Sequence, residues 1–191
     1  RRSSEPTLAA SWSRSGTAPS GVTRSTTSGN NWDRPWEASA SLIPARSEGD
    51  DLEVISLVLD PDVADTMYVA QRTTGVWKST NAGATWSAAG MDGSVIKGLQ
   101  VRPGTPSVLY ASTATSGVYR SANGGASWTG IGPAGQTTAT FAVSPSASTG
   151  VLYVGVSGAW VDRTEDDGAR WSSARTGLAA STVYSVADAP A

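Results

Sequence analysis

Short apolar segments that end in a proline recur along the chain, and each of the first three is followed by a second apolar segment. The first kind is "SLVLDP", "GLQVRP", "FAVSP" and "YSVADAP", ending at Pro61, Pro103, Pro145 and Pro190. The second kind is "TMYVA", "VLYAS" and "VLYVG", containing Tyr68, Tyr110 and Tyr153. Runs of this length that are rich in β-branched and aromatic residues and bounded by turn residues are typical of β-strands. The pattern predicts short strands separated by turns.

A polar stretch repeats in phase with these strands. "GVWKSTNAGATW" (75–86) recurs as "GVYRSANGGASW" (117–128), and more loosely as "WVDRTEDDGARW" (160–171) and "GVTRSTTSGNNW" (21–32). The final tryptophans are 54, 42 and 43 residues apart, at Trp32, Trp86, Trp128 and Trp171. A unit of about 42 residues with four strands, the fourth beginning at the tryptophan, has the size of one β-propeller blade. The sequence predicts an all-β propeller of four-stranded antiparallel blades, with four blades in this chain.

The centre of each repeat predicts a tight turn. The Asn81 side chain can accept hydrogen bonds from backbone N–H groups one or two residues ahead, and Gly83 supplies a positive φ. Thr85 begins the outgoing strand, and the ring of Trp86 is expected to pack against its own sheet. The central polar position is occupied by Thr27, Asn81, Asn123 and Asp166 in the four copies. Because that position varies while Gly and Trp do not, we expect a structural turn rather than a catalytic site.

The frame Ser-x-Asp-x-Gly-x-Thr-Trp resembles the Asp-box, or BNR repeat, of sialidases, xyloglucanase-type glycoside hydrolases, sortilin-like receptors and photosystem II assembly factors. The resemblance spans nearly the whole chain, although only Asp166 retains the aspartate, and Asn31 and Arg170 replace the threonine. It implies a box at the blade periphery, away from any active site, and an extracellular or cell-envelope protein. The box residues that it assigns are Ser25, Gly29, Trp32, Ser79, Asn81, Gly83, Thr85, Trp86, Ser121, Asn123, Gly125, Ser127, Trp128, Thr164, Asp166, Gly168 and Trp171.

The two ends of the chain predict how the ring closes. "VYSVADAPA" at the C-terminus has the pattern of a first strand, and "EPTLAAS" near the N-terminus has the pattern of a second. A single propeller domain, 1–191, would then hold four blades, formed by 182–191 with 1–32, by 52–86, by 95–128 and by 137–171. Two alternatives to this single-chain ring stay open. In the first, two chains together form a homodimeric ring of eight blades. In the second, the chain is part of a longer protein.

Composition narrows the chemistry. The chain has no Cys and no His, which excludes thiolate nucleophiles, Ser-His-Asp triads and imidazole-bound zinc, so we expect neither a metal nor a cofactor. The net charge is −2 and the 14 basic residues are scattered, which argues against nucleic acid as a partner. No apolar run approaches the about 18 residues of a membrane span.

The irregular interval between the first two boxes is the place where we expect function. Residues 33–51, "DRPWEASASLIPARSEGDD", form a predicted inserted loop between blades, and "WSRSGTAPS" lengthens a loop before it. Aromatic rings beside carboxylates and guanidinium groups suit a sugar or a peptide, although a solvated loop that caps the channel has the same composition. The candidate binding residues, with two from neighbouring loops, are Trp12, Arg14, Arg34, Trp36, Arg46, Arg72 and Trp160.

Two functions remain open at this point. The first is a non-catalytic scaffold that binds a protein or a glycan through loops on one face, and the absence of His and Cys favours it. The second, implied by the resemblance, is a glycoside hydrolase of the xyloglucanase-like or sialidase-like type, or a fragment of one. Hydrolysis requires two carboxyl groups about 5 Å or about 6.5–9.5 Å apart. The candidate catalytic carboxylates are Glu37, Glu48, Asp50 and Asp51.

Overall fold

The computed structural model describes residues 53–102, 108–133, 135–144, 150–157, 160–174 and 176. The described residues form twelve β-strands in three four-stranded antiparallel sheets. Within these ranges no residue belongs to a helix, so the described part of the chain holds no helix long and apolar enough to cross a membrane. The predicted all-β class of four-stranded antiparallel sheets is confirmed.

Each sheet is built from strands consecutive in sequence, in the order in which the chain makes them. The first sheet consists of β1 (Val54–Leu59), β2 (Met67–Gln71), β3 (Gly75–Ser79) and β4 (Ser87–Ala88). The second consists of β5 (Ile96–Arg102), β6 (Val108–Thr113), β7 (Val118–Ser121) and β8 (Thr129–Gly132). The third consists of β9 (Thr138–Val143), β10 (Leu152–Val156), β11 (Val161–Thr164) and β12 (Ser172–Ser173). In all three, the fourth strand begins one residue after the tryptophan rather than at it.

The turn between the first two strands is held by a side chain. In the first sheet, Leu59 pairs with Met67, and the Asp60 carboxylate that follows accepts the backbone N–H groups of Asp62 and Val63 at 3.1 and 3.2 Å. A short acidic side chain that bonds to the backbone ahead of it closes such turns. The chain therefore returns into β2 in a fixed register.

The sheets pack face to face through alternating side chains. Tyr68 and Ala70 of β2 belong to an apolar cluster shared with Ile96, Leu99 and Leu109 of the second sheet. A second cluster joins the other face of the second sheet to the third sheet, and includes Val108, Tyr110, Val118, Phe141, Leu152, Val154 and Val156. Because side chains alternate along a strand, the second sheet offers one apolar face to the first sheet and the other to the third.

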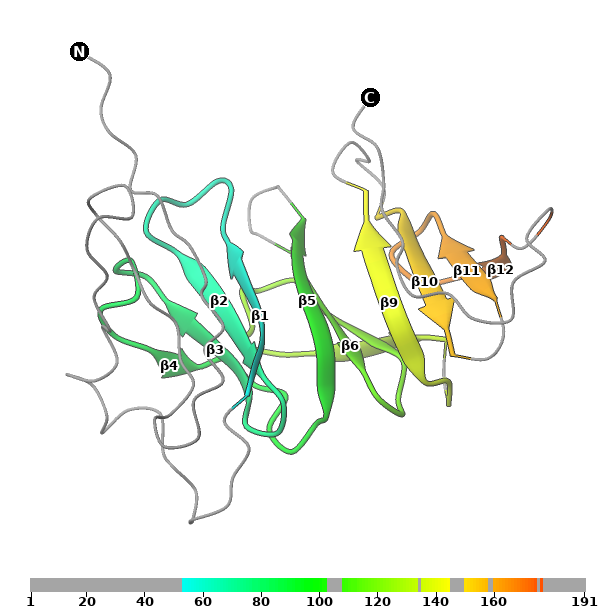
Figure 1. The fold of residues 1–191 in the computed structure, drawn as a ribbon. Coiled ribbons are helices and arrows are strands. Elements are labelled where there is room, and N and C mark those ends of the chain that lie inside the picture. The colour runs from blue at the N-terminus through cyan, green and yellow to red at the C-terminus, as the bar shows by residue number, and fades with distance from the viewer. Residues whose placement is uncertain are drawn as a thin grey trace, which may run out of the picture.

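The first strands of the three sheets lie side by side. Figure 1 shows β1, β5 and β9 in a row, and residue contacts join β1 to β5 and β5 to β9. The other strands of each sheet extend away from this row. Since the strands are antiparallel, the connections between second and third strands lie at one edge of the row, and the polar turns between third and fourth strands lie at the other.

Candidate functional site

The edge formed by the connections between second and third strands carries an exposed tryptophan. Trp160 stands directly before β11, and 40 % of its surface is exposed, whereas Trp77 and Trp86 are buried with 6 % exposed. Its backbone carbonyl accepts the N–H of Val156 at 2.9 Å, which ties it to the end of β10. The backbone of Trp160 is therefore held in the hairpin between β10 and β11, while part of its side chain faces solvent.

Trp160 replaces a glycine of the other two repeats. Gly75 and Gly117 occupy the same place in the frame, with φ angles of +92° and +77°. A Cβ at these positions would lie 2.5 Å from the carbonyl oxygen of Gly90 and 2.4 Å from that of Pro133. The first two sheets therefore exclude a side chain here. The third sheet carries the largest side chain at the same point, which is a departure from the structural rule of the repeat and marks the position as a functional candidate.

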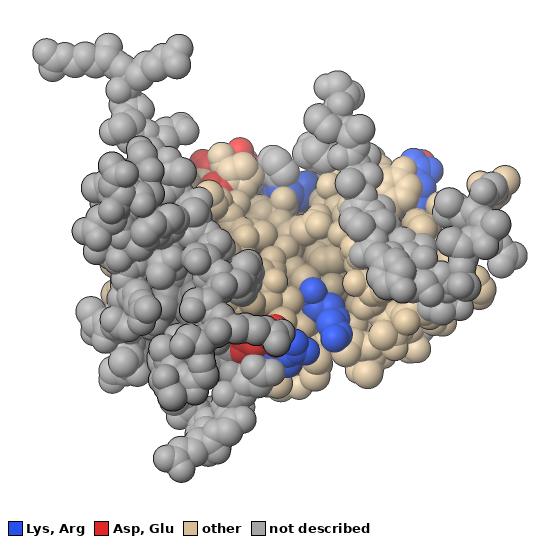
Figure 2. All heavy atoms as spheres, in the orientation of Figure 1, with Lys and Arg blue, Asp and Glu red and all other residues tan. Residues whose placement is uncertain are grey.

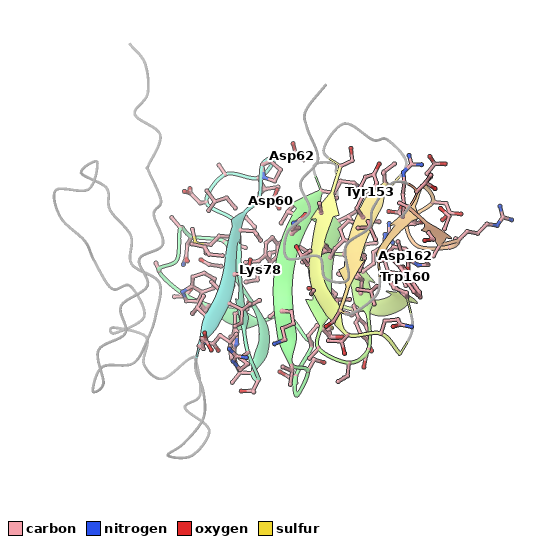
Figure 3. All side chains as sticks on the ribbon, turned by 45° about the vertical axis from the view of Figure 1, so that its right-hand side comes forward. Asp60, Asp62, Lys78, Tyr153, Trp160 and Asp162 are labelled. Carbon is pink, nitrogen blue, oxygen red and sulfur yellow. The ribbon has the colours of Figure 1, made fainter. Side chains whose placement is uncertain are left out.

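A carboxylate accompanies the indole. Asp162 lies two residues after Trp160 and is half-buried, and the two side chains lie next to one another in the third sheet (Figure 3). Burial raises the pKa of Asp162, and a hydrogen bond from Trp160 acts in the opposite direction. The equivalent positions hold the aromatic residues Trp77 and Tyr119. In the third repeat the aromatic residue therefore lies two positions earlier, at the edge of the sheet, and the strand position that is aromatic in the other two repeats holds a carboxylate.

Arg72, the other described member of the predicted binding set, lies at the same edge of the first sheet. Its Nε donates to Glu53 Oε2 at 2.9 Å, and its backbone N–H donates to the Glu53 carbonyl oxygen at 3.0 Å. Arg72 and Trp160 occupy equivalent connections of two sheets that are separated by the second sheet. The structure brings Trp160 together with Asp162, and it brings Arg72 together with Glu53.

The remaining predicted binding and catalytic residues lie outside the described residues. They are Trp12, Arg14, Arg34, Trp36, Arg46, Glu37, Glu48, Asp50 and Asp51, and the box residues Ser25, Gly29 and Trp32 lie outside them too. Within the described ranges, no group of three or more Asp and Glu residues is arranged to hold a metal ion. The described Lys and Arg side chains are scattered on the face shown in Figure 2.

The polar residues of the repeat are used in their own turns. Ser79 Oγ accepts the N–H of Gly83 at 2.8 Å, and Asn81 Oδ1 accepts the N–H of Thr85 at 2.9 Å, four residues ahead rather than one or two. Gly83 has a φ of +83°. The same bonds recur in the second sheet from Ser121 and Asn123 and in the third from Thr164 and Asp166. These groups are engaged with backbone N–H donors, so they offer little to a ligand.

The tryptophans that end the repeats connect neighbouring sheets. Trp128 Nε1 donates to the carbonyl oxygen of Ala89 at 2.7 Å, and Trp171 Nε1 donates to that of Ile131 at 2.6 Å. Ala89 follows the last strand of the first sheet, and Ile131 is in the last strand of the second. Trp86 packs in a cluster with residues of its own sheet, as expected, whereas the polar ends of the Trp128 and Trp171 indoles reach the preceding sheet.

A charged cluster joins the second and third sheets. Asp167, in the turn of the third repeat, accepts hydrogen bonds from Tyr110 and, at 2.7 Å, from Arg102, and it lies 3.4 Å from Arg120. Burial raises the pKa of Asp167, but the hydrogen bonds from Tyr110 and Arg102 outweigh it and leave the pKa below its ordinary value. Burial, together with the Asp167 hydrogen bond, raises the pKa of Tyr110. The cluster is a contact between sheets, in which one carboxylate of the third sheet faces two guanidinium groups of the second.

Sequence reasoning missed Asp162 and Asp167. The signal for Asp162 was visible in the frame, because "WVD" replaces "GVW" and "GVY" at the start of the third copy. No comparable signal identified Asp167, since its equivalents are Ala82 and Gly124 and its partners come from another repeat.

Comparisons with known proteins identify the fold. No family model matches the chain, and no curated protein matches its sequence. Among solved structures, the GH74 enzyme of Niastella koreensis is 22 % identical with a TM-score of 0.65, over 80 % of this chain and 26 % of that one. An ancestral GH74 enzyme is 22 % identical with a TM-score of 0.56, over 66 % of this chain and 18 % of that one. At this identity the likeness shows the fold alone, which is a β-propeller of four-stranded blades.

Proposed function

We propose that this chain belongs to a glycan-binding β-propeller, with Trp160 and Asp162 among the residues that contact the sugar. The observation that carries the proposal is the exposed indole of Trp160 at a position where the other two described blades exclude any side chain. The equivalent residues, Gly75 and Gly117, have no side chain, so the repeat itself does not require an indole at this position. The proposal keeps the scaffold function expected from the sequence and chooses a glycan over a protein as the ligand.

The chemistry of the pair suits a neutral saccharide. The face of an indole covers the C–H face of a pyranose ring, which is apolar. The Asp162 carboxylate accepts hydrogen bonds from sugar hydroxyls and would repel an acidic sugar. Because Trp160 lies at the edge of its sheet with 40 % of its surface exposed, we expect a long saccharide chain to pass across it. A neutral polysaccharide such as a β-glucan therefore fits better than a sialylated glycan.

Affinity electrophoresis tests this proposal. Full-length protein is run through gels that contain xyloglucan, mixed-linkage β-glucan or a polysialic acid, and the Trp160→Ala variant is run beside it. The variant is expected to bind a neutral glucan about tenfold more weakly or worse, because truncating an anchoring tryptophan costs more than about 1 kcal/mol. Val63→Ala is the matched control, since Val63 is 47 % exposed at the opposite edge. Equal retardation of Trp160→Ala and the parent protein would contradict the proposal.

Glycoside hydrolysis is the second candidate, and the two GH74 neighbours favour it. Burial raises the pKa of Asp162, which is the direction that a general acid requires. A second carboxyl group would have to come from Glu37, Glu48, Asp50 or Asp51, which lie outside the described residues. Chromogenic β-glycosides and xyloglucan distinguish the candidates. Turnover that disappears in Glu48→Gln or Asp50→Asn would establish hydrolysis, and binding without turnover would leave the non-catalytic scaffold function.

Either function places the protein where polysaccharides are found, so we propose an extracellular or cell-envelope location.

A further inference from the structure

The indole N–H of Trp160 is held by a charged side chain. The side chain of Trp160 donates a hydrogen bond to the Asp162 carboxylate, and the ring N–H is the one donor that an indole has. The acceptor is half-buried in β11, whereas the ring lies at the edge of the sheet with 40 % of the residue exposed. The carboxylate therefore fixes the direction in which the polar edge of an exposed ring points.

The first sheet holds an indole in the reverse arrangement. There the ring belongs to the strand, at Trp77, and its Nε1 donates to Thr74 Oγ1 at 3.3 Å, in the connection directly before β3. In the third sheet the ring lies in the connection, at Trp160, and the acceptor Asp162 lies in the strand. Both sheets thus place an indole and its side-chain acceptor at the start of the third strand. Of the two acceptors, the carboxylate can lose its charge and the hydroxyl of Thr74 cannot.

We propose that Asp162 is a positioning residue for the glycan site, whose carboxylate holds the Trp160 ring in the orientation that receives the sugar and whose protonation weakens glycan binding. This inference rests on the proposed function of Trp160. A side chain that is already oriented loses less rotational freedom when a ligand binds, so it binds that ligand more tightly. An ionised acceptor forms a stronger hydrogen bond than a neutral one, so the ring is held best while Asp162 carries its charge.

The elements packed around Asp162 leave it to titrate by itself. Val154 of β10 and Ser173 of β12 pair with Asp162, and neither side chain titrates in this range. Of the second-sheet residues in the cluster that packs on the third sheet, Tyr110 alone can titrate, and its hydroxyl donates to Asp167 in the turn at the opposite edge.

The next residue of the strand, Arg163, faces the other way. Side chains alternate along β11, and the Arg163 guanidinium lies 5.5 Å from the centre of the Tyr153 ring and pairs with Glu165. Burial raises the pKa of Asp162, the bond from Trp160 lowers it less, and no charged group of the described residues contributes to the shift. The carboxylate is ionised above this raised pKa, so glycan binding should be strongest above it and should weaken as the pH falls through it.

The Trp160 indole signal of the free protein tests the positioning without a ligand. The full chain is labelled with ¹⁵N in tryptophan, and the signals are assigned from single Trp→Phe variants. Between about pH 7 and about pH 3, the range in which an aspartate titrates, the Trp160 indole proton is expected to move upfield, because its acceptor becomes neutral. The Trp128 and Trp171 indoles are internal controls for pH and folding, since they donate to backbone carbonyl oxygens, which do not titrate. A Trp160 signal that follows the same pH course in Asp162→Asn would overturn the proposal.

Calorimetric titration of the full chain with xyloglucan oligosaccharides tests the consequence for binding. The parent protein is expected to bind about tenfold more weakly at a pH below the pKa of Asp162 than at pH 7, and Asp162→Asn should bind weakly at both. Glu165→Gln is the matched control, because it removes a carboxylate of the same sheet that pairs with Arg163, and it should keep the pH dependence of the parent.

The outcomes separate this inference from the proposed function. Binding that is equally tight at both pH values, or a pH dependence that survives in Asp162→Asn, would overturn the inference and leave the glycan site in place. Absence of binding at every pH would contradict the proposed function, and with it the pH dependence of binding. The indole titration would then still decide whether Asp162 positions the ring.

Discussion

The contact between Gly125 and Ala89 gives a quantitative test of how the blades pack. Gly125 has a φ of +92°, and an added Cβ would meet Ala89 Cβ at 2.7 Å and the Ala89 carbonyl oxygen at 3.0 Å. Gly135 has a φ of +69°, and an added Cβ there would meet nothing within 4 Å. Both glycines therefore adopt a positive φ that disfavours a residue with a Cβ, but only at Gly125 would the added Cβ also collide with a neighbouring residue.

The magnitudes follow from that difference. A left-handed conformation costs a residue with a Cβ about 1–2 kcal/mol, and both Gly125→Ala and Gly135→Ala carry this cost. Overpacking at a close contact adds about 1–3 kcal/mol, which applies to Gly125→Ala alone. We expect a total loss of about 2–5 kcal/mol for Gly125→Ala and about 1–2 kcal/mol for Gly135→Ala.

Thermal unfolding of both variants beside the parent protein checks the reasoning. For a chain of this size, 1 kcal/mol lowers Tm by about 2–4 °C, so Gly125→Ala should melt about 2–12 °C below Gly135→Ala. Urea unfolding supplies the same comparison as a free energy. Equal losses in the two variants would refute the claim that the turn glycine is required by contact with the preceding blade.

Two further predictions concern the turns and the charged cluster. Ser121→Ala removes the buried hydroxyl that accepts the Gly125 N–H at 2.9 Å and should cost about 1–3 kcal/mol in urea unfolding, whereas Ser127→Ala at an exposed position should stay within about 0.5 kcal/mol. Asp167→Asn should destabilise the protein at pH 7, because the folded-state pKa of Asp167 lies below its ordinary value. That stabilisation is present above the unfolded pKa of about 3.9 and is lost as the pH falls through the folded pKa. The difference between Asp167→Asn and the parent should therefore shrink in unfolding measured from pH 5 downward, and a difference independent of pH would contradict the assignment of the shift to this cluster.

The periodic features of the fold could be predicted from the sequence because they depend on neighbours within one repeat. The strand that carries Tyr68, the turn conformation at Gly83 and the strand after Trp86 are set by residues a few positions apart. Copies of the same pattern made these features visible even though the polar residues between them differ.

Features that depend on contact between repeats could not be predicted in the same way. The sequence showed that Trp128 is large and recurs in phase, but not that its N–H reaches Ala89, 39 residues away. The partners of Asp167 lie 57 and 65 residues away, and no pattern within a single repeat refers to them. The sequence identifies Trp160 as an aromatic residue in a predicted loop. Its clearer distinction, that it stands in place of a glycine with no room for a side chain, required the positions of Gly90 and Pro133.

We propose above that the indole of Trp160 binds a neutral glycan. The most direct measurement is an NMR titration of the ¹⁵N-tryptophan-labelled full chain with xyloglucan oligosaccharides, in which the eight indole signals report separately. We predict that the Trp160 indole signal shifts and saturates, and that the signals of Trp128 and Trp171 at the contacts between blades stay in place. A saturating shift confined to other tryptophans, or no shift with any neutral glucan, would contradict the claim.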